Sequence, residues 1–531
     1  MSDNFLDNEY DLIVVGSGMG GGTLVRSLQG CGLRIGIVER GGFLPREEAN
    51  WNPTAVFLED RYKPGERWLD KEGREFNPSI HYFVGGNTKV YGAALLRLRR
   101  RDFEELEHAE GVSPAWPITY DDLEPYYAKA ERLFFVHGES GADPTEPERS
   151  TDYPYPALPN EMFVEEFAAN LKRQGLHPSP LPLAVDLNKS GRCIRCRTCD
   201  GFPCKLHAKG DAEVCCILPA LKDADIELIP NVRIDYLRTN SAGDRVEAAV
   251  GRQFGRSVSL CARYFVLAAG AVNSAVVLLR STSKKHPLGL ANSSGLVGRN
   301  YMMHNNSAVL GVNLTRKNPV TFQKTLQIND FYFSGGSEFP FPLGNLQMLG
   351  KVQAAMLKGS NPWVPNSILR GIAQRSIDLW AISEDLPNPD NQVVLTEDGK
   401  ISVRRTANNF KAHQELLKVT RRMLVRSGFP FVFAETVGIG ANSHQCGTLR
   451  FGTDPGRSVL DIYCRTHDVA NLSVVDASFF PSSAAVNPAL TVAAQALRVG
   501  ERLRENLKGA TQTVTSPHRL ADRDKIKGCA I

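Results

Sequence analysis

The chain has 531 residues, of which 62 are lysine or arginine and 58 are aspartate or glutamate, for a formal net charge of +4. This near balance gives no reason to expect nucleic acid or a membrane surface as a partner. No apolar run reaches the roughly 18 residues that a membrane span needs, and the polar start is unlike a signal peptide. We therefore expect a cytoplasmic protein, with at least two domains at this length.

Residues 9–40 have the pattern of a nucleotide-binding βαβ unit. An apolar run leads into a glycine-rich turn, an amphipathic stretch and a second apolar run that ends at Glu39. Gly16 permits a tight turn, Gly18 lets the backbone approach a pyrophosphate, and Gly21 lets the helix pack close to the strand. The helix N-terminus attracts phosphate, and Glu39 stands where a carboxylate meets an adenosine ribose. We expect a dinucleotide site, and FAD rather than NAD because the site opens at the N-terminus.

Downstream of this unit, strand-like and helical patterns alternate. Thr119 is placed to cap a helix, with Asp122 three positions on as in a capping box. Short apolar runs separated by turns at 301–437 favour an antiparallel sheet. The other expected elements are strands at 226–237, 246–258 and 264–270, a helix at 271–280, a strand at 472–475 and a helix at 488–506. This order predicts one nucleotide-binding domain that a second domain interrupts twice.

Six of the 11 cysteines fall between Cys193 and Cys216, a pattern unlike a secreted disulfide framework. Four of them have a spacing similar to that of iron–sulfur ligands, but the fourth stands one residue later than in the ferredoxin run. These four are Cys193, Cys196, Cys199 and Cys204. The pattern leaves three interpretations open: an iron–sulfur cluster, a zinc site or disulfide, or reduced structural thiols.

Together with the N-terminal turn, three further stretches resemble the glucose–methanol–choline (GMC) flavoprotein oxidoreductases, in particular the pyranose oxidase and bacterial sugar and glycoside 3-oxidase branch. The stretches are VGGNTKVYG at 84–92, LVGRNYMMH at 296–304, and NSHQCGT at 442–448 with VDAS at 475–478 and NPALT at 487–491.

The resemblance implies an α/β fold, with a Rossmann-type FAD-binding domain of the glutathione-reductase type and an α+β substrate domain built on an antiparallel sheet. The implied boundaries are 1–105, 190–300 and 440–510 for the FAD domain, 106–189 and 301–439 for the substrate domain, and 511–531 for a polar tail.

The resemblance also implies roles for individual residues. His444 and Asn487 match the catalytic pair of the sugar-oxidising branches, whereas His304 is expected to be structural. Val90 stands where some members carry the histidine that bonds to the flavin, so we expect FAD to be held non-covalently. The cofactor-binding positions implied here and by the N-terminal turn are Gly16, Gly18, Gly21, Glu39, Gly85, Gly86, Asn87, Thr88, Val232, Asp476, Asn487, Pro488 and Thr491.

The chemistry of alcohol oxidation explains why a histidine and an asparagine suit this site. An alcohol becomes a good hydride donor only as its hydroxyl proton leaves, and histidine is a suitable base because its pKa lies near neutrality. We therefore expect His444 to be the general base. The amide of Asn487 can orient the substrate oxygen, and FAD accepts the hydride.

We expect the protein to oxidise a secondary ring hydroxyl, at C3 or C2 of a sugar or glycoside, to a ketone, with O2 or another electron acceptor. The alternative is oxidation of a primary hydroxyl of an aminoglycoside-type sugar to an aldehyde. A third interpretation is a dehydrogenase subunit that passes electrons through an iron–sulfur cluster to a partner protein. The sequence leaves the sugar, the acceptor and the oligomeric state open.

Overall fold

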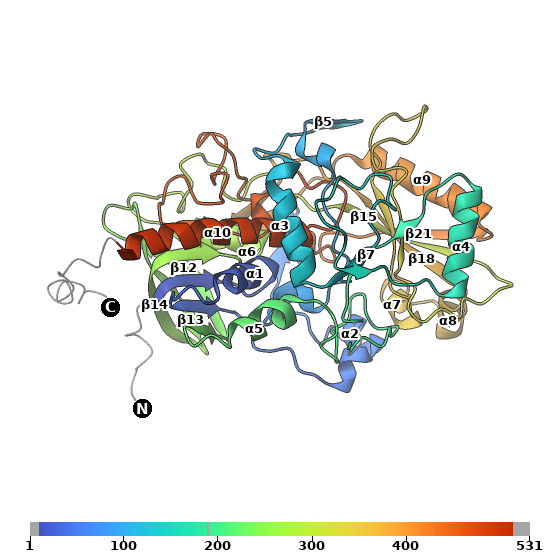
Figure 1. Ribbon diagram of the computed structural model, residues 1–531, viewed down its shortest axis with the longest axis horizontal. Coiled ribbons are helices and arrows are strands. Elements are labelled where there is room, and N and C mark those ends of the chain that lie inside the picture. Colours follow the sequence, from blue (N-terminus) through green and yellow to red (C-terminus); the bar gives the residue numbers. More distant parts are fainter. Residues whose placement is uncertain (1–9, 188–190, 513–531) are drawn as a thin grey trace.

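Two large sheets occupy opposite halves of the molecule in the computed structural model, which describes residues 10–187 and 191–512 (Figure 1). The seven-stranded sheet comprises β11 (Ile226–Ile229), β2 (Ile35–Val38), β1 (Tyr10–Val15), β14 (Arg256–Leu267), β13 (Val246–Gln253), β12 (Val232–Thr239) and β22 (Leu472–Val474). The six-stranded sheet comprises β21 (Phe431–Thr436), β15 (Asn305–Val312), β18 (Ser376–Ser383), β17 (Asn345–Met348), β16 (Leu326–Ile328) and β9 (Ser179–Pro180).

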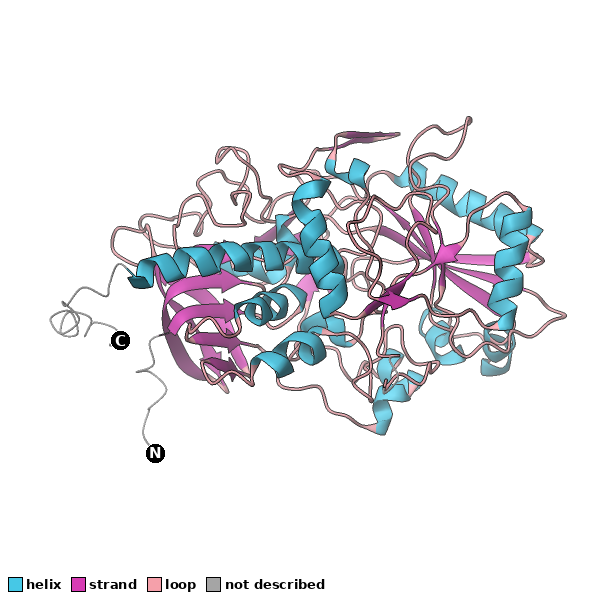
Figure 2. Cartoon of the chain, in the orientation of Figure 1, coloured by secondary structure: helices cyan, strands magenta, loops and turns pink. Residues whose placement is uncertain are grey.

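Smaller sheets and the helices complete the fold (Figure 2). The short strands are β19 (Gln392–Leu395), β20 (Ile401–Arg404), β3 (Trp68–Leu69), β4 (Glu75–Phe76), β10 (Leu183–Ala184), β7 (Val136–Gly138), β8 (Tyr155–Pro156), β5 (Leu106–His108) and β6 (Gly111–Ser113). The helices are α1 (Met19–Leu28), α2 (Pro53–Phe57), α3 (Tyr120–Leu133), α4 (Met162–Arg173), α5 (Leu218–Ala220), α6 (Ala271–Arg280), α7 (Ala354–Ser360), α8 (Asn366–Ala373), α9 (Phe410–Arg426) and α10 (Ala489–Gln512).

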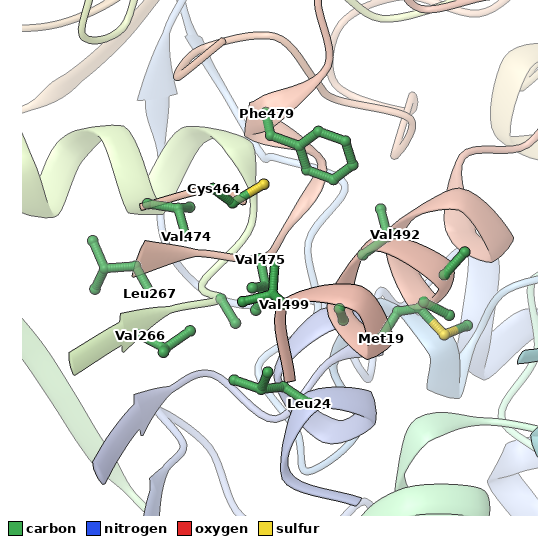
Figure 3. Packing of buried hydrophobic residues seen from close by; sticks show 14 of the residues in the cluster. Met19, Leu24, Val266, Leu267, Cys464, Val474, Val475, Phe479, Val492 and Val499 are labelled. Carbon is green, nitrogen blue, oxygen red and sulfur yellow. The ribbon is translucent and has the colours of Figure 1, made fainter. Parts of the chain in front are cut away.

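The parallel part of the seven-stranded sheet forms the predicted nucleotide-binding core. β1 lies between β2 and β14, parallel to both, and β22 extends the sheet beyond β14. These strands are almost continuously apolar because helices cover both faces of a parallel sheet. Figure 3 shows α1, β14 and α10 contributing Met19, Leu24, Leu267, Val492 and Val499 to one buried cluster. The predicted Rossmann-type arrangement is confirmed.

The six-stranded sheet presents one face to helices and the other to the interior of the molecule. Val309, Leu379 and Leu346, on neighbouring strands, pack against α4 and α9 through an apolar cluster. On the opposite face, Asn306 of β15, Trp380 of β18 and Gln347 of β17 line a cavity, because side chains alternate between the faces of a strand. The predicted antiparallel sheet is confirmed, and its polar inner face is available for a ligand.

Several elements differ from the sequence prediction in extent. The stretch at 246–258 is not one strand: a turn at Phe254 and Gly255 separates β13 from β14. β14 pairs antiparallel with β13 through its first half and parallel with β1 through its second half. Helices α7, α8 and α9 also occur inside the 301–437 segment, where the sequence predicted strands and turns. The Thr119 cap of α3 is confirmed, with Asp122 completing the capping box.

The domain boundaries stay a prediction, and two contacts join the predicted segments across them. β3, inside the first FAD segment, pairs with β20 of the substrate segment. α3, inside the first substrate segment, packs against α10. The polar tail predicted at 511–531 lies outside the described residues except for the last two residues of α10. None of the helices in the described ranges combines the length and the apolar character needed to cross a membrane.

Candidate active site

One cavity of about 600 Å³ runs between the two large sheets, from the N-terminal glycine turn to His444 and Asn487. Its walls come from segments far apart in the chain. Of the predicted site residues, those that line it are Gly16, Gly18, Glu39, Gly86, Asn87, Thr88, Val232, Asp476, Asn487, Pro488 and His444. The fold therefore brings most of the predicted residues to one cavity.

The N-terminal turn has the geometry that close phosphate approach requires. Gly16 has a φ of +107°, and a Cβ there would lie 2.3 Å from the carbonyl oxygen of Ala268. Gly18 caps α1 without any side-chain bond to the helix N-terminus, so backbone N–H groups of the first turn remain for an anion. Gly21 does not line the cavity. A Cβ there would lie 2.0 Å from the Gly16 oxygen, which agrees with its predicted packing role.

Glu39 is buried at the far end of the cavity. Its Oε2 accepts bonds from the Ser17 hydroxyl (2.6 Å) and backbone N–H (3.1 Å), and its Oε1 accepts one from the Gly41 N–H (3.1 Å). Burial raises the pKa of this carboxyl, and these hydrogen bonds oppose the shift. Val232 is one of the predicted cofactor-binding residues. Its backbone N–H donates to the Glu39 carbonyl (2.9 Å), so this N–H group is not available to the adenine of a bound FAD.

The second glycine turn is bonded to the first. The Gly85 N–H donates to the Ser17 hydroxyl (3.0 Å), and Gly85 itself does not line the cavity. The Thr88 hydroxyl donates to the Gly85 carbonyl (2.5 Å), and Asn87 Oδ1 accepts from the His81 N–H (2.8 Å). These side chains shape the turn, which leaves the backbone of Gly86 close to that of Gly18.

The C-terminal block places Asp476 and the start of α10 on the cavity wall. Asp476 is buried, and it accepts bonds from the N–H groups of Gly270 (3.0 Å) and Ser478 (3.0 Å). Burial raises its pKa. Pro488 lines the cavity just before α10, whereas the Thr491 hydroxyl bonds to the Tyr127 hydroxyl (2.7 Å) and does not line it.

His444 and Asn487 lie together at the other end of the cavity. Asn487 Nδ2 is 3.4 Å from His444 Nε2, and Asn487 Oδ1 accepts a bond from Gln347 Nε2 (2.9 Å). The bond from Gln347 orients the Asn487 amide so that its NH2 group faces His444. A substrate oxygen that accepts from this NH2 group would hold its own proton near His444 Nε2.

A chain of hydrogen bonds defines the tautomer of His444. His304 Nε2 lies 3.0 Å from the Ser483 carbonyl oxygen, which can only accept, so this nitrogen carries a proton. In neutral His304 the other nitrogen is then an acceptor, and His444 Nδ1, 2.9 Å away, donates to it. His444 Nε2 is therefore unprotonated; its lone pair faces the Asn487 NH2 group (3.4 Å) on the wall of the cavity and can accept a proton, as a general base requires.

The surroundings of His444 favour its neutral form. Burial lowers the pKa of His444 well below its ordinary value, and the neighbouring His304 and the Lys324 cation lower it further. Burial also lowers the pKa of His304. Both imidazoles are thus uncharged at neutral pH, and the tautomer chain holds under those conditions.

The four closely spaced cysteines lie apart from this pair, around a small cavity of about 20 Å³. They are free thiols, and burial raises the pKa of Cys193 and, to about 12, that of Cys199. Across the described residues, no group of three or more His, Cys, Asp or Glu side chains is arranged to hold a metal ion. The three interpretations of these cysteines stay predictions.

Sequence reasoning missed several residues of this site. Ser17 joins both glycine turns to Glu39, and its position between two glycines of the fingerprint could have singled it out. Asp200, Lys324 and Gln347 also line the cavity. The last two lie in the 301–437 segment, where no local pattern distinguishes them, and only the folded chain brings them to His444.

Several known proteins are similar to this chain over most of its length. The chain is 30% identical to 6'''-hydroxyparomomycin C oxidase of Streptomyces lividus, covering 94% of this chain and 92% of that protein. It is 30% identical, with the same coverage, to paromamine 6'-oxidase of Streptomyces fradiae. The crystal structure of pyridoxine 4-oxidase from Mesorbium loti has a similar fold, with a TM-score of 0.66 and 17% identity over 94% of this chain and 99% of that one.

The family described as GMC oxidoreductase matches residues 72–306 with its N-terminal part and residues 387–496 with its C-terminal part. The predicted cofactor, FAD, is confirmed with the family, and the cavity has the glycine turns, helix N-terminus and buried carboxylates that suit it. The chain is an oxidoreductase that acts on CH–OH donors, and it belongs to the GMC oxidoreductase family.

Proposed function

We propose that this protein oxidises a hydroxyl group of a sugar-containing substrate, with His444 as the base and Asn487 as the group that orients the reacting oxygen. The observation that carries the proposal is the unprotonated Nε2 of His444, which faces the Asn487 amide on the wall of the shared cavity. FAD, when bound, supplies the hydride acceptor.

Three residues of the protein have distinct roles in the proposed reaction. Asn487 Nδ2 donates to the substrate oxygen, and His444 Nε2 removes the hydroxyl proton as the C–H bond weakens. Gln347 holds the Asn487 amide in the orientation that makes this donation possible.

The comparisons support the primary-hydroxyl alternative better than a secondary ring hydroxyl. Paromamine 6'-oxidase is named for the 6' position, and carbon 6 of a hexose ring carries the primary alcohol. We therefore propose a primary sugar hydroxyl as the reacting group. Oxidation at C3 or C2 stays a prediction from sequence.

An anaerobic absorption experiment with the FAD-containing protein tests both the sugar substrate and the position of the reacting hydroxyl. Methyl glucoside, its 6-deoxy analogue and its 3-deoxy analogue are added in turn, and bleaching of the flavin bands is followed. We expect bleaching by the parent and the 3-deoxy sugar only. Bleaching by the 6-deoxy but not the 3-deoxy sugar would return the assignment to C3, and no bleaching by any sugar would overturn the sugar substrate.

His444→Ala provides the matched test of the base. Loss of a general base typically costs about 10²- to 10⁴-fold in rate, so this variant is expected to retain FAD but to reduce it at least a hundredfold more slowly. His413→Ala, at a buried histidine that bonds only to Ser307 and Ser383 in the described chain, is the control. Near-normal reduction in His444→Ala would contradict the assignment.

A further inference from the structure

The wall of the cavity near His444 contains a buried ion pair that the reaction described above does not use. Lys324 Nζ lies 2.6 Å from Asp200 Oδ2, and the lysine is only 5% exposed. Both residues line the cavity together with His444 and Asn487. Lys324 is close enough to His444 for its charge to act on the imidazole.

The backbone around this pair is built to accommodate it. A Cβ on Gly92 would lie 2.1 Å from Lys324 Nζ and 2.3 Å from Asp200 Oδ1, so only glycine leaves room there. The Gly350 N–H donates to Asp200 Oδ2 (3.2 Å). Four segments from different parts of the chain, those of Gly92, Asp200, Lys324 and Gly350, therefore meet at the pair.

Lys209 explains how Asp200 reaches the wall from the cysteine-rich loop. Its buried ammonium donates to the carbonyl oxygens of Tyr91 (2.7 Å), Cys199 (2.8 Å) and Phe202 (2.9 Å). These bonds tie the residues on either side of Asp200 to the segment that carries Gly92. The cysteine-rich loop thus has a role in this site: it presents the Asp200 carboxylate to the cavity.

The pair and two further residues that line the same cavity retain unused hydrogen-bonding capacity. Among the described residues, Asp200 is the one hydrogen-bond partner of the Lys324 ammonium, which carries three N–H groups. Asn306 Oδ1 and Gln347 Oε1 are buried, belong to side chains that are 1% exposed, and have no partner within the described chain. Buried polar groups are usually paired, so these two acceptors and the free N–H groups point to a polar ligand.

Resting on the proposed function, we infer that Lys324, Asp200, Asn306 and Gln347 form a subsite for the uncharged hydroxyl groups that flank the reacting one. A neutral diol offers oxygen acceptors to the Lys324 ammonium and O–H donors to the amide oxygens and to Asp200. The one charged pair in this subsite has no net charge. Because Lys324 already pairs with Asp200 (2.6 Å), the subsite offers an incoming ammonium little net attraction to offset the cost of its desolvation, so it favours a hydroxylated ring over one that carries an amine there.

The test compares two substitutions of Lys324 in the FAD-containing enzyme. Lys324→Met removes the charge and the donors, whereas Lys324→Gln removes the charge and keeps a donor. A hydrogen bond to a charged group corresponds to about a 10- to 100-fold change in an equilibrium constant. For a neutral glycoside we therefore expect KM to rise about 10- to 100-fold in Lys324→Met and less in Lys324→Gln. Lys418→Met, at an exposed lysine on α9, is the control.

A second comparison uses methyl glucoside and its 4-amino-4-deoxy analogue, because the C4 hydroxyl is the ring hydroxyl nearest to the proposed reacting group at C6. The preference is the ratio of kcat/KM for the neutral sugar to kcat/KM for the amino sugar. We expect this ratio to be above one in the wild-type enzyme. In both Lys324 variants we expect the logarithm of the ratio to fall to half or less of its wild-type value. Flavin absorbance and Tm verify that each variant folds and holds FAD. Unchanged KM and unchanged preference in folded variants would overturn the subsite, while sugars would still reduce the flavin. Failure of every sugar with the wild-type enzyme would instead overturn the proposed function.

Discussion

At the scale of single residues, His444 depends on His304 for its chemistry. The Ser483 carbonyl orders the protons of both imidazoles, so the lone pair of His444 faces the cavity only while His304 accepts from Nδ1. His304 is thus a positioning residue, although its sequence context indicated only a structural role. The distinction matters because a positioning residue affects the rate of proton removal without contacting the substrate.

Replacing His304 tests this dependence. In His304→Leu the acceptor for His444 Nδ1 is lost, and we expect the rate constant for flavin reduction to fall about tenfold or more, since correct orientation of a base is part of its contribution. His304→Gln keeps one acceptor and one donor and is expected to recover most of the rate. Stopped-flow reduction at saturating sugar measures both. Equal rates in His304→Leu and the wild type would contradict the role.

The pH dependence of the reaction follows from the pKa of His444. Burial, His304 and Lys324 all lower this pKa below its ordinary value of 6.5, and the base must be neutral to accept a proton. The rate of flavin reduction should therefore be constant through neutral pH and fall only in acid, below pH 6.5. A pH series of single-turnover rates of flavin reduction checks this. If the rate falls with a midpoint above pH 6.5, the protein stabilises the protonated imidazole of His444, and the expectation is wrong.

At the scale of elements, the glycines of α1 set how close the helix lies to the sheet. A Cβ on Gly20 would lie 1.8 Å from the Val475 carbonyl oxygen, whereas one on Gly22 would lie no closer than 3.2 Å to its neighbours. Both are helical positions where alanine is intrinsically preferred by about 1 kcal/mol. Their different surroundings therefore decide the outcome of substitution.

Gly20→Ala and Gly22→Ala form a matched pair for this packing. We expect Gly20→Ala to destabilise the fold by about 1–3 kcal/mol through overpacking and to weaken FAD retention, because α1 must move from the phosphate site. Gly22→Ala should change stability by less than about 1 kcal/mol. Chemical unfolding and the FAD-to-protein absorbance ratio measure the two effects. Similar losses in both variants would mean that helix packing does not govern cofactor binding.

Elements with a regular local pattern were predictable from sequence, and those shaped by distant partners were not. The capped start of α3 and the whole of α6 follow from signals within a few residues. The extent of β14 could not be predicted from local signals, because its first half pairs antiparallel with β13 and its second half pairs parallel with β1. Helix α9 owes its position to the sheet face that it covers, which no local signal identifies.

At the scale of the whole molecule, the cavity joins the two large sheets. At one end, Glu39 directly follows β2 of the nucleotide-binding sheet and Val232 begins β12 of the same sheet, while Gln347 and Trp380 at the other end belong to the six-stranded sheet. A cofactor that fills this space contacts both. Its binding free energy therefore adds to the stability of the folded chain as a whole.

Removal of FAD should lower Tm, and added FAD should restore it in a concentration-dependent way. At a hundredfold excess over Kd the stabilisation is about 2.7 kcal/mol. FMN, which lacks the adenosine that the Glu39 end would hold, should restore less. Thermal unfolding of the apoprotein against each flavin measures this. A Tm that is independent of FAD would contradict the assignment of the cavity as the cofactor site.

The sequence by itself determined the family and the nucleotide turn and singled out His444 and Asn487 as candidates, because each of these features can be read from short motifs along the chain. The tertiary structure decided the tautomer of His444, the separation of Thr491 from the cavity and the meeting of Asp200 with Lys324. Hydrogen bonds between residues more than a hundred positions apart specify these features, and their partners are known only once the chain has folded.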